Sequence, residues 1–423
     1  MCAGCDQTRS LHMIEKLFTE GVIGPLKIRN RSIRSAAYEG MAPGHMVSDE
    51  LIDYHRAVAA GGIGMTTVAY ASVMQSGLSF PNQLWLRKEA VPGLRKLTDA
   101  VHAEGAHASI QIGHCGNMAC YRLSGGLPWA PSGGINLYGP TFPRTMHRKD
   151  ISEVIDHFKL AVGLARESGF DAIEVHAGHG YLISQFLSPY SNHRKDNYGG
   201  SFENRTRLMR EVMDQVMPAA GNDMAVLVKM NMRDGFKGGM DIEECLEVAK
   251  ILEKTGVHAI ILSGGFVSRA PMYVMRGAMP FRVMSAGVKN PVTRMLMRWF
   301  GGVLCKPEPF EEAYFLEDAC RFRNALKLPL VYVGGLNSRE AIEKTLGKGF
   351  DFVAFARALV NDPAFIRKLE TGESDCTECN TSNFCVASIY TGSMRCHQHV
   401  DHLPEKWKKE LEKGRPCRSS CSS

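Results

Sequence analysis

The chain has 423 residues, of which 44% are hydrophobic and 22% are charged, an ordinary globular composition with ample length to bury a large core. Its formal net charge of +6 is spread along the sequence, which argues against a nucleic-acid-binding surface. No apolar run is long enough to span a membrane, and residues 1–16 lack the apolar core of a secretory signal. We therefore expect a cytoplasmic protein whose partners include neither nucleic acid nor membranes.

Short apolar segments alternate with helical patterns from about residue 31 onward. Several of these segments are unbroken apolar runs, typical of parallel strands covered on both faces. Asp241 and Ser338 are predicted to cap two of the intervening helices, and Glu244 would complete a capping box with Asp241. An alternative doubly wound sheet would need a glycine-rich phosphate motif after an early strand, and the sequence has none there. The pattern thus predicts an α/β protein with a closed (β/α)8 TIM barrel, with strands at 33–37, 63–69, 106–112, 172–176, 225–230, 259–262, 328–334 and 351–355.

Two long segments, 113–149 and 266–312, each follow a predicted strand and should lie over the carboxyl ends of the strands. Loops of this length are often functional lids, although a surface insertion is the alternative. Trp299, Phe300 and many methionines favour a lid over an apolar substrate. We expect a tail over 1–16, a barrel with long lid loops over 17–370 and a cysteine-rich extension over 371–423.

The densest chemical signal is the sequence HAGHGY, in which His176 and His179 follow the fourth predicted strand and Tyr181 comes two residues later. Catalytic residues of βα barrels lie at this edge. Two imidazoles there can donate hydrogen bonds to a carbonyl oxygen, and a tyrosine can supply a proton. The spacing alone leaves open a metal pair or two structural histidines.

This stretch, together with QFLSP at 185–189 and NHRKDNYGGSFENR at 192–205, resembles the old yellow enzyme family of FMN-dependent ene-reductases, also described as NADH:flavin oxidoreductases. The resemblance runs from about residue 17 to about residue 363 and places the chain in the His-His branch, near the barrel domain of 2,4-dienoyl-CoA reductase-like proteins. Within the 192–205 segment, we expect a buried structural network of Arg194, Asp196, Glu203 and Arg205.

The resemblance implies a role for individual residues. His176 and His179 match the pair that binds the substrate carbonyl, and Tyr181 matches the proton donor. The positions implied to contact FMN are Ala36 and Tyr38 after the first strand, Gln111 and Lys229 beside the flavin ring, and Gly265, Gly334, Gly335, Ala356 and Arg357, of which the last four would hold the phosphate. Glycines and a helix amino terminus suit an anion, and a cation beside the ring would stabilise the anionic reduced flavin. Tyr38 departs from the Cys, Thr or His of better-known relatives, which leaves redox tuning open.

Four cysteines follow the barrel, and their number and clustering could serve a metal site. The resembled relatives 2,4-dienoyl-CoA reductase and trimethylamine dehydrogenase hold a [4Fe–4S] cluster at the corresponding place, with a tighter middle spacing. A [4Fe–4S] cluster, a zinc ion and reduced structural cysteines therefore all stay open for Cys376, Cys379, Cys385 and Cys396.

The resemblance implies an NAD(P)H-dependent FMN oxidoreductase that reduces the C=C bond of α,β-unsaturated carbonyl compounds, with hydride from flavin N5 and a proton from Tyr181. Its partners would be an enone-type small molecule and NADH or NADPH, and a homo-oligomer stays open. One alternative is a flavin-dependent amine or alcohol dehydrogenase of the trimethylamine dehydrogenase kind. Another is a flavin-free barrel isomerase or lyase that binds a substrate phosphate.

Overall fold

Eight parallel strands close into one barrel, which confirms the predicted TIM-barrel fold. The structure is a computed structural model that describes residues 13–398 apart from 137–140, 287, 289, 305, 390 and 391, together with residue 408; the side chains of 303 and 304 are outside the description. Every predicted strand position overlaps an observed strand, because these apolar runs are buried on both faces. In chain order the barrel strands are β3 (Ser32–Arg34), β4 (Met65–Ser72), β5 (His107–Gly113), β8 (Ala172–Ala177), β9 (Ala225–Asn231), β10 (Ala259–Ser263), β11 (Leu330–Val333) and β12 (Phe352–Phe355).

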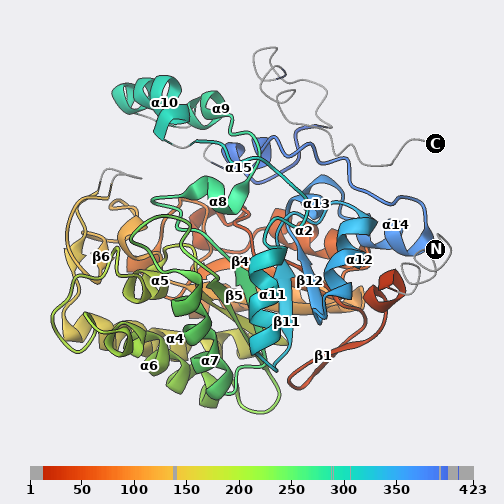
Figure 1. Ribbon diagram of the computed structural model, residues 1–423, viewed down its shortest axis with the longest axis horizontal. Coiled ribbons are helices and arrows are strands. Elements are labelled where there is room, and N and C mark those ends of the chain that lie inside the picture. The colour runs from red at the N-terminus through yellow and green to blue at the C-terminus, as the bar shows by residue number, and fades with distance from the viewer. Residues whose placement is uncertain are drawn as a thin grey trace, which may run out of the picture.

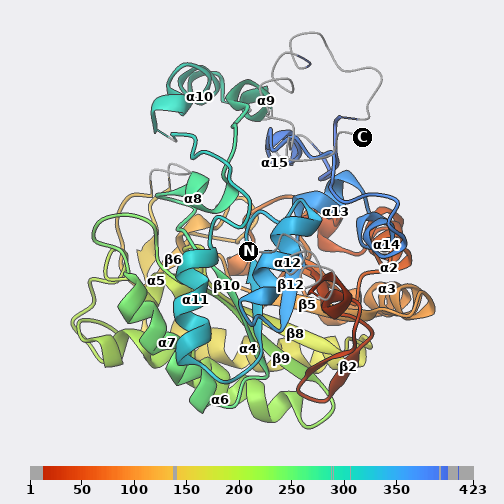
Figure 2. The same ribbon diagram turned by 45° about the vertical axis from the view of Figure 1, so that its right-hand side comes forward.

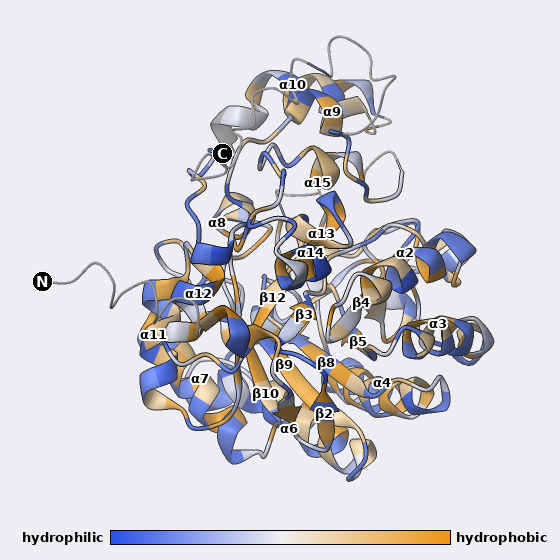
Figure 3. Ribbon diagram, turned by 90° about the vertical axis from the view of Figure 1, so that its right-hand side faces the viewer, coloured by the Kyte–Doolittle hydropathy of each residue, from blue (hydrophilic) through white to orange (hydrophobic). Residues whose placement is uncertain are grey.

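Helices cover the outside of the barrel (Figures 1 and 2). Figure 3 shows the strands in the orange of apolar residues, surrounded by helices that carry both polar and apolar residues. In α4, for example, Val154, Phe158 and Val162 recur at helical spacing and are buried against the barrel. The helices around the barrel are α2 (Asp49–Ala60), α3 (Val91–Ala103), α4 (Arg148–Glu167), α5 (Leu182–Leu187), α6 (Phe202–Ala220), α7 (Ile242–Lys254), α11 (Leu316–Ala325), α12 (Arg339–Gly347), α13 (Arg357–Asn361) and α14 (Phe365–Thr371).

Both predicted helix caps are present. The Asp241 carboxylate accepts a hydrogen bond from the Glu244 N–H at 2.9 Å, and the Ser338 hydroxyl accepts one from the Ala341 N–H at 3.2 Å. The second half of the predicted capping box differs, because the Glu244 carboxylate pairs with Arg205. These caps fix where α7 and α12 begin.

A β-hairpin closes the end of the barrel away from the strands' carboxyl ends. Its strands β1 (Gly21–Ile23) and β2 (Leu26–Ile28) pair antiparallel. Ile23 and Ile28 are fully buried in a cluster with the interior residues Met65, Ala225 and Phe352. The barrel interior is therefore a packed core at this end, and chemistry is left to the opposite end.

The long loops lie at the carboxyl ends of the strands. The loop after β5 carries a small parallel sheet of β6 (Trp129–Ala130) and β7 (Arg144–Thr145). The segment after β10 forms α8 (Pro271–Met275), α9 (Phe281–Ala286) and α10 (Pro291–Leu304). Figures 1 and 2 show α9 and α10 above α8, with α9 next to α15 (Phe384–Ser388). Trp299 and Phe300 differ from the lid prediction, because they are 73% and 55% exposed.

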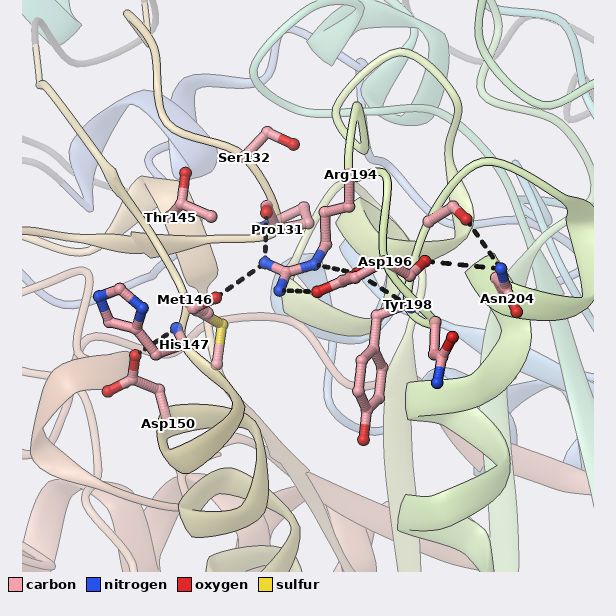
Figure 4. A network of polar contacts seen from close by, with 12 residues as sticks. Pro131, Ser132, Thr145, Met146, His147, Asp150, Arg194, Asp196, Tyr198 and Asn204 are labelled. Carbon is pink, nitrogen blue, oxygen red and sulfur yellow. Dashed lines mark hydrogen bonds and ion pairs between the residues drawn. The ribbon is translucent and has the colours of Figure 1, made fainter.

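Arg194 ties the loop after β5 to the segment after β8 (Figure 4). Its guanidinium donates to the carbonyl oxygens of Pro131 and Met146, each at 2.8 Å, and pairs with Asp196. The predicted single buried network is wrong in part. Glu203 is exposed, and Arg205 pairs separately with Glu244.

The carboxyl-terminal extension returns over the barrel end. Phe384 and Ala387 of α15 pack with Val283 and Met284 of α9 in a small apolar cluster. Most of the predicted tail over 1–16, and the extension beyond 398 except residue 408, lie outside the described residues. Among the described helices, none combines the length and apolar character that crossing a bilayer requires.

Candidate active site

The two histidines and the tyrosine of the HAGHGY sequence come together at the end of β8. The ring centroids of His176 and His179 lie 5.1 Å apart, and those of His176 and Tyr181 lie 4.7 Å apart. Tyr70 of β4 adds a fourth ring, 5.1 Å from Tyr181. The three side chains predicted to be catalytic therefore form one cluster at the mouth of the barrel.

The backbone and ring of His179 are held by the next two strands. Its φ of +60° lies in the left-handed region, which is strained for a residue with a side chain. The Asn231 side chain accepts the His179 N–H at 2.9 Å, and the Ser263 hydroxyl lies 2.7 Å from His179 Nε2. Asn231 and Ser263 are paired in register at the ends of β9 and β10. The sequence predicts no contact of either residue with the histidine, because only the barrel register brings them to it.

Both imidazoles are electrically neutral near pH 7. Burial, and to a smaller extent the nearby Lys229 cation, together lower the pKa of His179 to about 3. Burial, then His179, then Lys229 hold the pKa of His176 well below its ordinary value. A neutral imidazole can donate one hydrogen bond, so the pair suits an oxygen that gains negative charge during a reaction.

Lys229 is a buried cation with a defined set of partners. It lies in register beside His176 and is only 1% exposed. Its ammonium group donates to the Ser35 hydroxyl at 3.1 Å and lies 2.9 Å from the Glu174 carboxylate. Burial lowers the pKa of Lys229, and Glu174 opposes that shift. The carboxylate thereby favours a charged lysine at the barrel mouth.

Glu174 also orients Gln111, its register partner on β5. The Gln111 amide nitrogen donates to Glu174 Oε1, which leaves the amide oxygen of Gln111 to accept a hydrogen bond from a ligand. Glu174 itself was not predicted as a site residue, although it lies only two positions before His176.

The turn after β3 carries the predicted residues Ala36 and Tyr38. The Ala36 carbonyl oxygen accepts from Lys229 at 3.4 Å, so this turn borders the lysine. Tyr38 points to Phe80, with ring centroids 4.6 Å apart. Glu39, at the end of the turn, forms a buried ion pair with Arg34 at 2.8 Å. This pair anchors the turn to the barrel.

The glycines after β11 lie beside aromatic and basic side chains of the long loops. Gly335 has a φ of +71°, and an added Cβ would lie 2.7 Å from a ring carbon of Tyr314. The Arg276 guanidinium lies over the same Tyr314 ring, 4.8 Å from its centroid. Gly334 precedes this position, with its carbonyl oxygen accepting from the Tyr332 hydroxyl at 2.9 Å. The two glycines therefore lie close to the Arg276 cation, a residue that the sequence analysis did not predict as part of the site.

Ala356 and Arg357, the other two residues predicted to hold the phosphate, and Gly265, predicted to contact FMN, have different partners. Ala356 is the amino-terminal cap of α13 and has no capping side chain. Arg357 donates to the Arg276 carbonyl oxygen at 2.8 Å and to the Asn383 side chain at 2.7 Å. Gly265, with a φ of +96°, accepts a hydrogen bond from the Asn231 amide at 2.8 Å. Arg357 is thus fixed by the loops around it.

These residues fit a bound FMN. Lys229 and Gln111 offer a cation and a carbonyl oxygen to a flavin ring. Within the described part of the chain, the buried Nε of Arg276 has no hydrogen-bond partner, and a phosphate oxygen would satisfy such a donor. Gly335 lies against the Tyr314 ring over which Arg276 stacks, and a glycine there leaves the backbone without a side chain that would obstruct a bound anion.

The cysteines of the extension form a separate hollow beside Arg357, lined in part by Cys379, Cys385 and Cys396. Cys376 is disulfide-bonded, whereas the other three are free thiols. Over the described residues, no group of three or more His, Cys, Asp or Glu side chains is arranged to hold a metal ion. The iron–sulfur or zinc site stays a prediction, which iron and zinc analysis of anaerobically purified protein would test.

A barrel that gathers neutral imidazoles, a buried lysine, and glycines with nearby arginines at its strand ends has the features of a flavin-dependent oxidoreductase. Comparison with known proteins identifies the family. The sequence model described as the NADH:flavin oxidoreductase / NADH oxidase family matches residues 16–296, and the chain belongs to this family. The protein is an NAD(P)H-dependent flavin oxidoreductase related to the old yellow enzymes, which leaves the flavin-free isomerase alternative without support.

Three relatives illustrate this relationship. The chain is 41% identical to the 4,4'-dithiodibutanoate disulfide reductase of Rhodococcus erythropolis, over 90% of this chain and 94% of the relative. It is 33% identical to the NADH oxidase of Thermoanaerobacter brockii, over 86% of this chain but only 52% of the relative. The solved 2-naphthoyl-CoA reductase complex is similar in fold, with a TM-score of 0.78 at 24% identity, over 94% of this chain and 58% of that protein.

Proposed function

We propose that the protein reduces the C=C bond of α,β-unsaturated carbonyl compounds with electrons from NADH or NADPH. The observation that carries the proposal is the cluster of His176, His179 and Tyr181 beside the buried Lys229. Neutral imidazoles suit a carbonyl oxygen as ligand, because their N–H groups stabilise the negative charge that develops on this oxygen only during the reaction.

Each residue has a defined task in this proposal. His176 and His179 hold the carbonyl oxygen and donate hydrogen bonds as it becomes negative. FMN, when bound, supplies the hydride that reaches the β-carbon. Tyr181 gives its phenolic proton to the α-carbon and regains a proton from water, which completes the addition of two hydrogens across the bond. Asn231 and Ser263 orient His179, and Glu174 keeps Lys229 charged and Gln111 oriented.

The test is anaerobic turnover of 2-cyclohexen-1-one with each nicotinamide, for the native protein and for His176→Ala. Loss of one such hydrogen-bond donor lowers the rate by about 100- to 1000-fold in comparable sites. His157→Ala is a matched control, because that histidine lies on α4, outside the cluster, with its Nδ1 2.8 Å from the Glu153 carbonyl oxygen of the same helix. Full activity of His176→Ala would contradict the role of the histidine pair.

A second candidate function is the reductive cleavage of an organic disulfide. The observation in its favour is the 41% identity to the 4,4'-dithiodibutanoate disulfide reductase over nearly the whole of that protein. We expect the two reactions to be distinguished by measuring turnover of 4,4'-dithiodibutanoate and of the enone in parallel. If the protein is a disulfide reductase, it should turn over 4,4'-dithiodibutanoate much faster than the enone. His176→Ala does not separate the two functions, because the histidines could equally bind the carboxylate or the sulfur of a disulfide substrate.

A further inference from the structure

Helix α10 carries a broad apolar stripe that the rest of the described chain does not cover. The stripe occupies positions i, i+3, i+4, i+7 and i+8, which share one face of a helix. Figures 1 and 2 show α10 at the outer end of the molecule, above the barrel. All five side chains of the stripe are about half exposed or more: Val292, Met295, Leu296, Trp299 and Phe300.

The opposite side of α10 accounts for the packing that this helix does make. Met297 packs with the apolar cluster of α9 and α15, and Gly301 lies against Phe281, where an added Cβ would be 2.6 Å from a ring carbon. Figure 3 shows both polar and apolar residues on α10. The helix is therefore held in place by one face, while its stripe is presented outward. Contiguous exposed apolar surface of this kind usually marks a binding surface.

Basic side chains border the stripe. Arg282 of α9, with Arg294 and Arg298 of α10, lines a hollow of about 360 Å³ together with Met295 and Trp299. The sequence has no aspartate or glutamate from residue 254 to residue 307, but it has eight lysines and arginines there. This part of the surface thus combines an apolar face with positive charge and has no acidic residue of its own to offset it.

The charge pattern favours an anionic partner over a second copy of the chain. Two copies packed through their stripes would bring together two surfaces that carry positive charge and no acidic residue of the 254–307 segment to pair with it, and like charges oppose such pairing. A helix with tryptophan and phenylalanine on its apolar face and arginines beside it has the composition of helices that lie in the interface of anionic membranes. Because no described helix is long and apolar enough to cross a bilayer, such contact would be peripheral.

We propose that α10 is an interfacial helix that binds the protein to the surface of anionic phospholipid bilayers. The stripe enters the boundary between headgroups and acyl chains, and Arg282, Arg294 and Arg298 contact lipid phosphates. The proposal is independent of which substrate the barrel reduces. It departs from our expectation that membranes are not partners, because a search for spanning segments does not detect a helix that lies along the interface.

The test is co-sedimentation of the full-length protein with vesicles of phosphatidylcholine alone or of phosphatidylcholine with phosphatidylglycerol. We expect binding to the anionic vesicles, weaker binding at high salt, and little binding to the neutral vesicles. Brominated lipid should quench the fluorescence of Trp299. The Trp299→Phe variant should lose that quenching while it still binds the vesicles. Each arginine near an anionic membrane surface raises the binding affinity about 5-fold. The double variant Arg294→Gln/Arg298→Gln should therefore bind the anionic vesicles about 30-fold more weakly.

Two further variants make the result decisive. Trp299→Ser/Phe300→Ser should abolish vesicle binding, and Lys96→Gln/Lys159→Gln, which removes two exposed charges from α3 and α4, should leave it unchanged. Circular dichroism confirms that each variant is folded. Equal binding to both kinds of vesicle, or binding that the α10 variants leave intact, would overturn the proposal. So would a concentration-dependent dimer that Trp299→Ser/Phe300→Ser dissociates, because the stripe would then cover a second copy.

Discussion

Glu174→Gln tests the buried polar pair behind the candidate flavin site. The substitution keeps the size of the side chain and an oxygen that can accept from Gln111, but it removes the charge that faces Lys229 at 2.9 Å. Both side chains are buried, at 1% and 2% exposure. Removing one partner of a buried ion pair typically costs about 3–5 kcal/mol, because the other charge is left uncompensated. That is a large part of a typical domain stability of about 5–15 kcal/mol.

The loss should depend on pH in a defined direction. Burial already lowers the pKa of Lys229, and without Glu174 this pKa falls further. Between the lowered folded-state pKa and the unfolded value of about 10.4, the unfolded chain binds more protons than the folded one. Stability of the variant therefore rises with pH across this window, and its deficit relative to the native protein should shrink as the pH approaches the unfolded value.

The assay is urea unfolding followed by circular dichroism, at neutral and at alkaline pH. Glu20→Gln provides the control, since the same chemical change at an exposed position should alter stability by less than about 0.5 kcal/mol. The double variant Glu174→Gln/Lys229→Met removes both charges and should be more stable than Glu174→Gln alone. A Glu174→Gln protein as stable as the Glu20→Gln control would refute the view that this carboxylate compensates the buried lysine.

Three further predictions concern the catalytic, phosphate and structural regions. His176→Ala should weaken binding of a phenol to the oxidised enzyme, measured by its long-wavelength absorbance, because an oxyanion donor is lost. Gly335→Ala should lower FMN affinity, measured by flavin fluorescence, because its φ of +71° costs about 1–2 kcal/mol for alanine and the methyl group would press on Tyr314. Asp171→Asn should destabilise the protein by about 1 kcal/mol more at pH 5 than at pH 9 in thermal unfolding.

The sign of the last prediction follows from the pKa shifts. Hydrogen bonds to Asp171 raise the pKa of His102 and of His107, so the stability that these histidines contribute is fully present below about pH 6.5 and is lost as the pH rises through their folded values. The pKa of Asp171 is lowered in turn, so the aspartate is charged throughout this range. An equal loss of stability of Asp171→Asn at both pH values would contradict the pairing of Asp171 with the two histidines. Unchanged phenol binding by His176→Ala would contradict the role of His176. Native FMN affinity in Gly335→Ala would contradict the phosphate site.

The sequence was sufficient to predict the barrel, because the strands are apolar runs whose burial is a local property of each segment. The first strand shows the limit of this reasoning. Residues 33–37 were predicted, whereas β3 ends at Arg34. Ser35 still donates its backbone N–H to the Phe355 carbonyl oxygen of β12, but its hydroxyl and the Ala36 carbonyl oxygen accept from Lys229 on β9, a contact far away in the sequence that no local pattern predicts.

The site shows the same division between local and distant information. The grouping of His176, His179 and Tyr181 follows from a motif of six residues and was predictable. Their supporting partners were not. Asn231 and Ser263 reach His179 only through the register of β9 and β10, and Arg276 belongs to a loop whose path depends on contacts with Arg357 and Asn383.

The most direct test of the central claim is the visible spectrum of the purified protein during an anaerobic titration with NADH and with NADPH. We expect bound FMN, or stoichiometric uptake of added FMN, and bleaching of the flavin band by at least one of the two nicotinamides. A colourless protein that does not take up FMN, or a bound flavin that neither nicotinamide reduces, would contradict the assignment of the strand ends as a flavin site for nicotinamide-driven reduction.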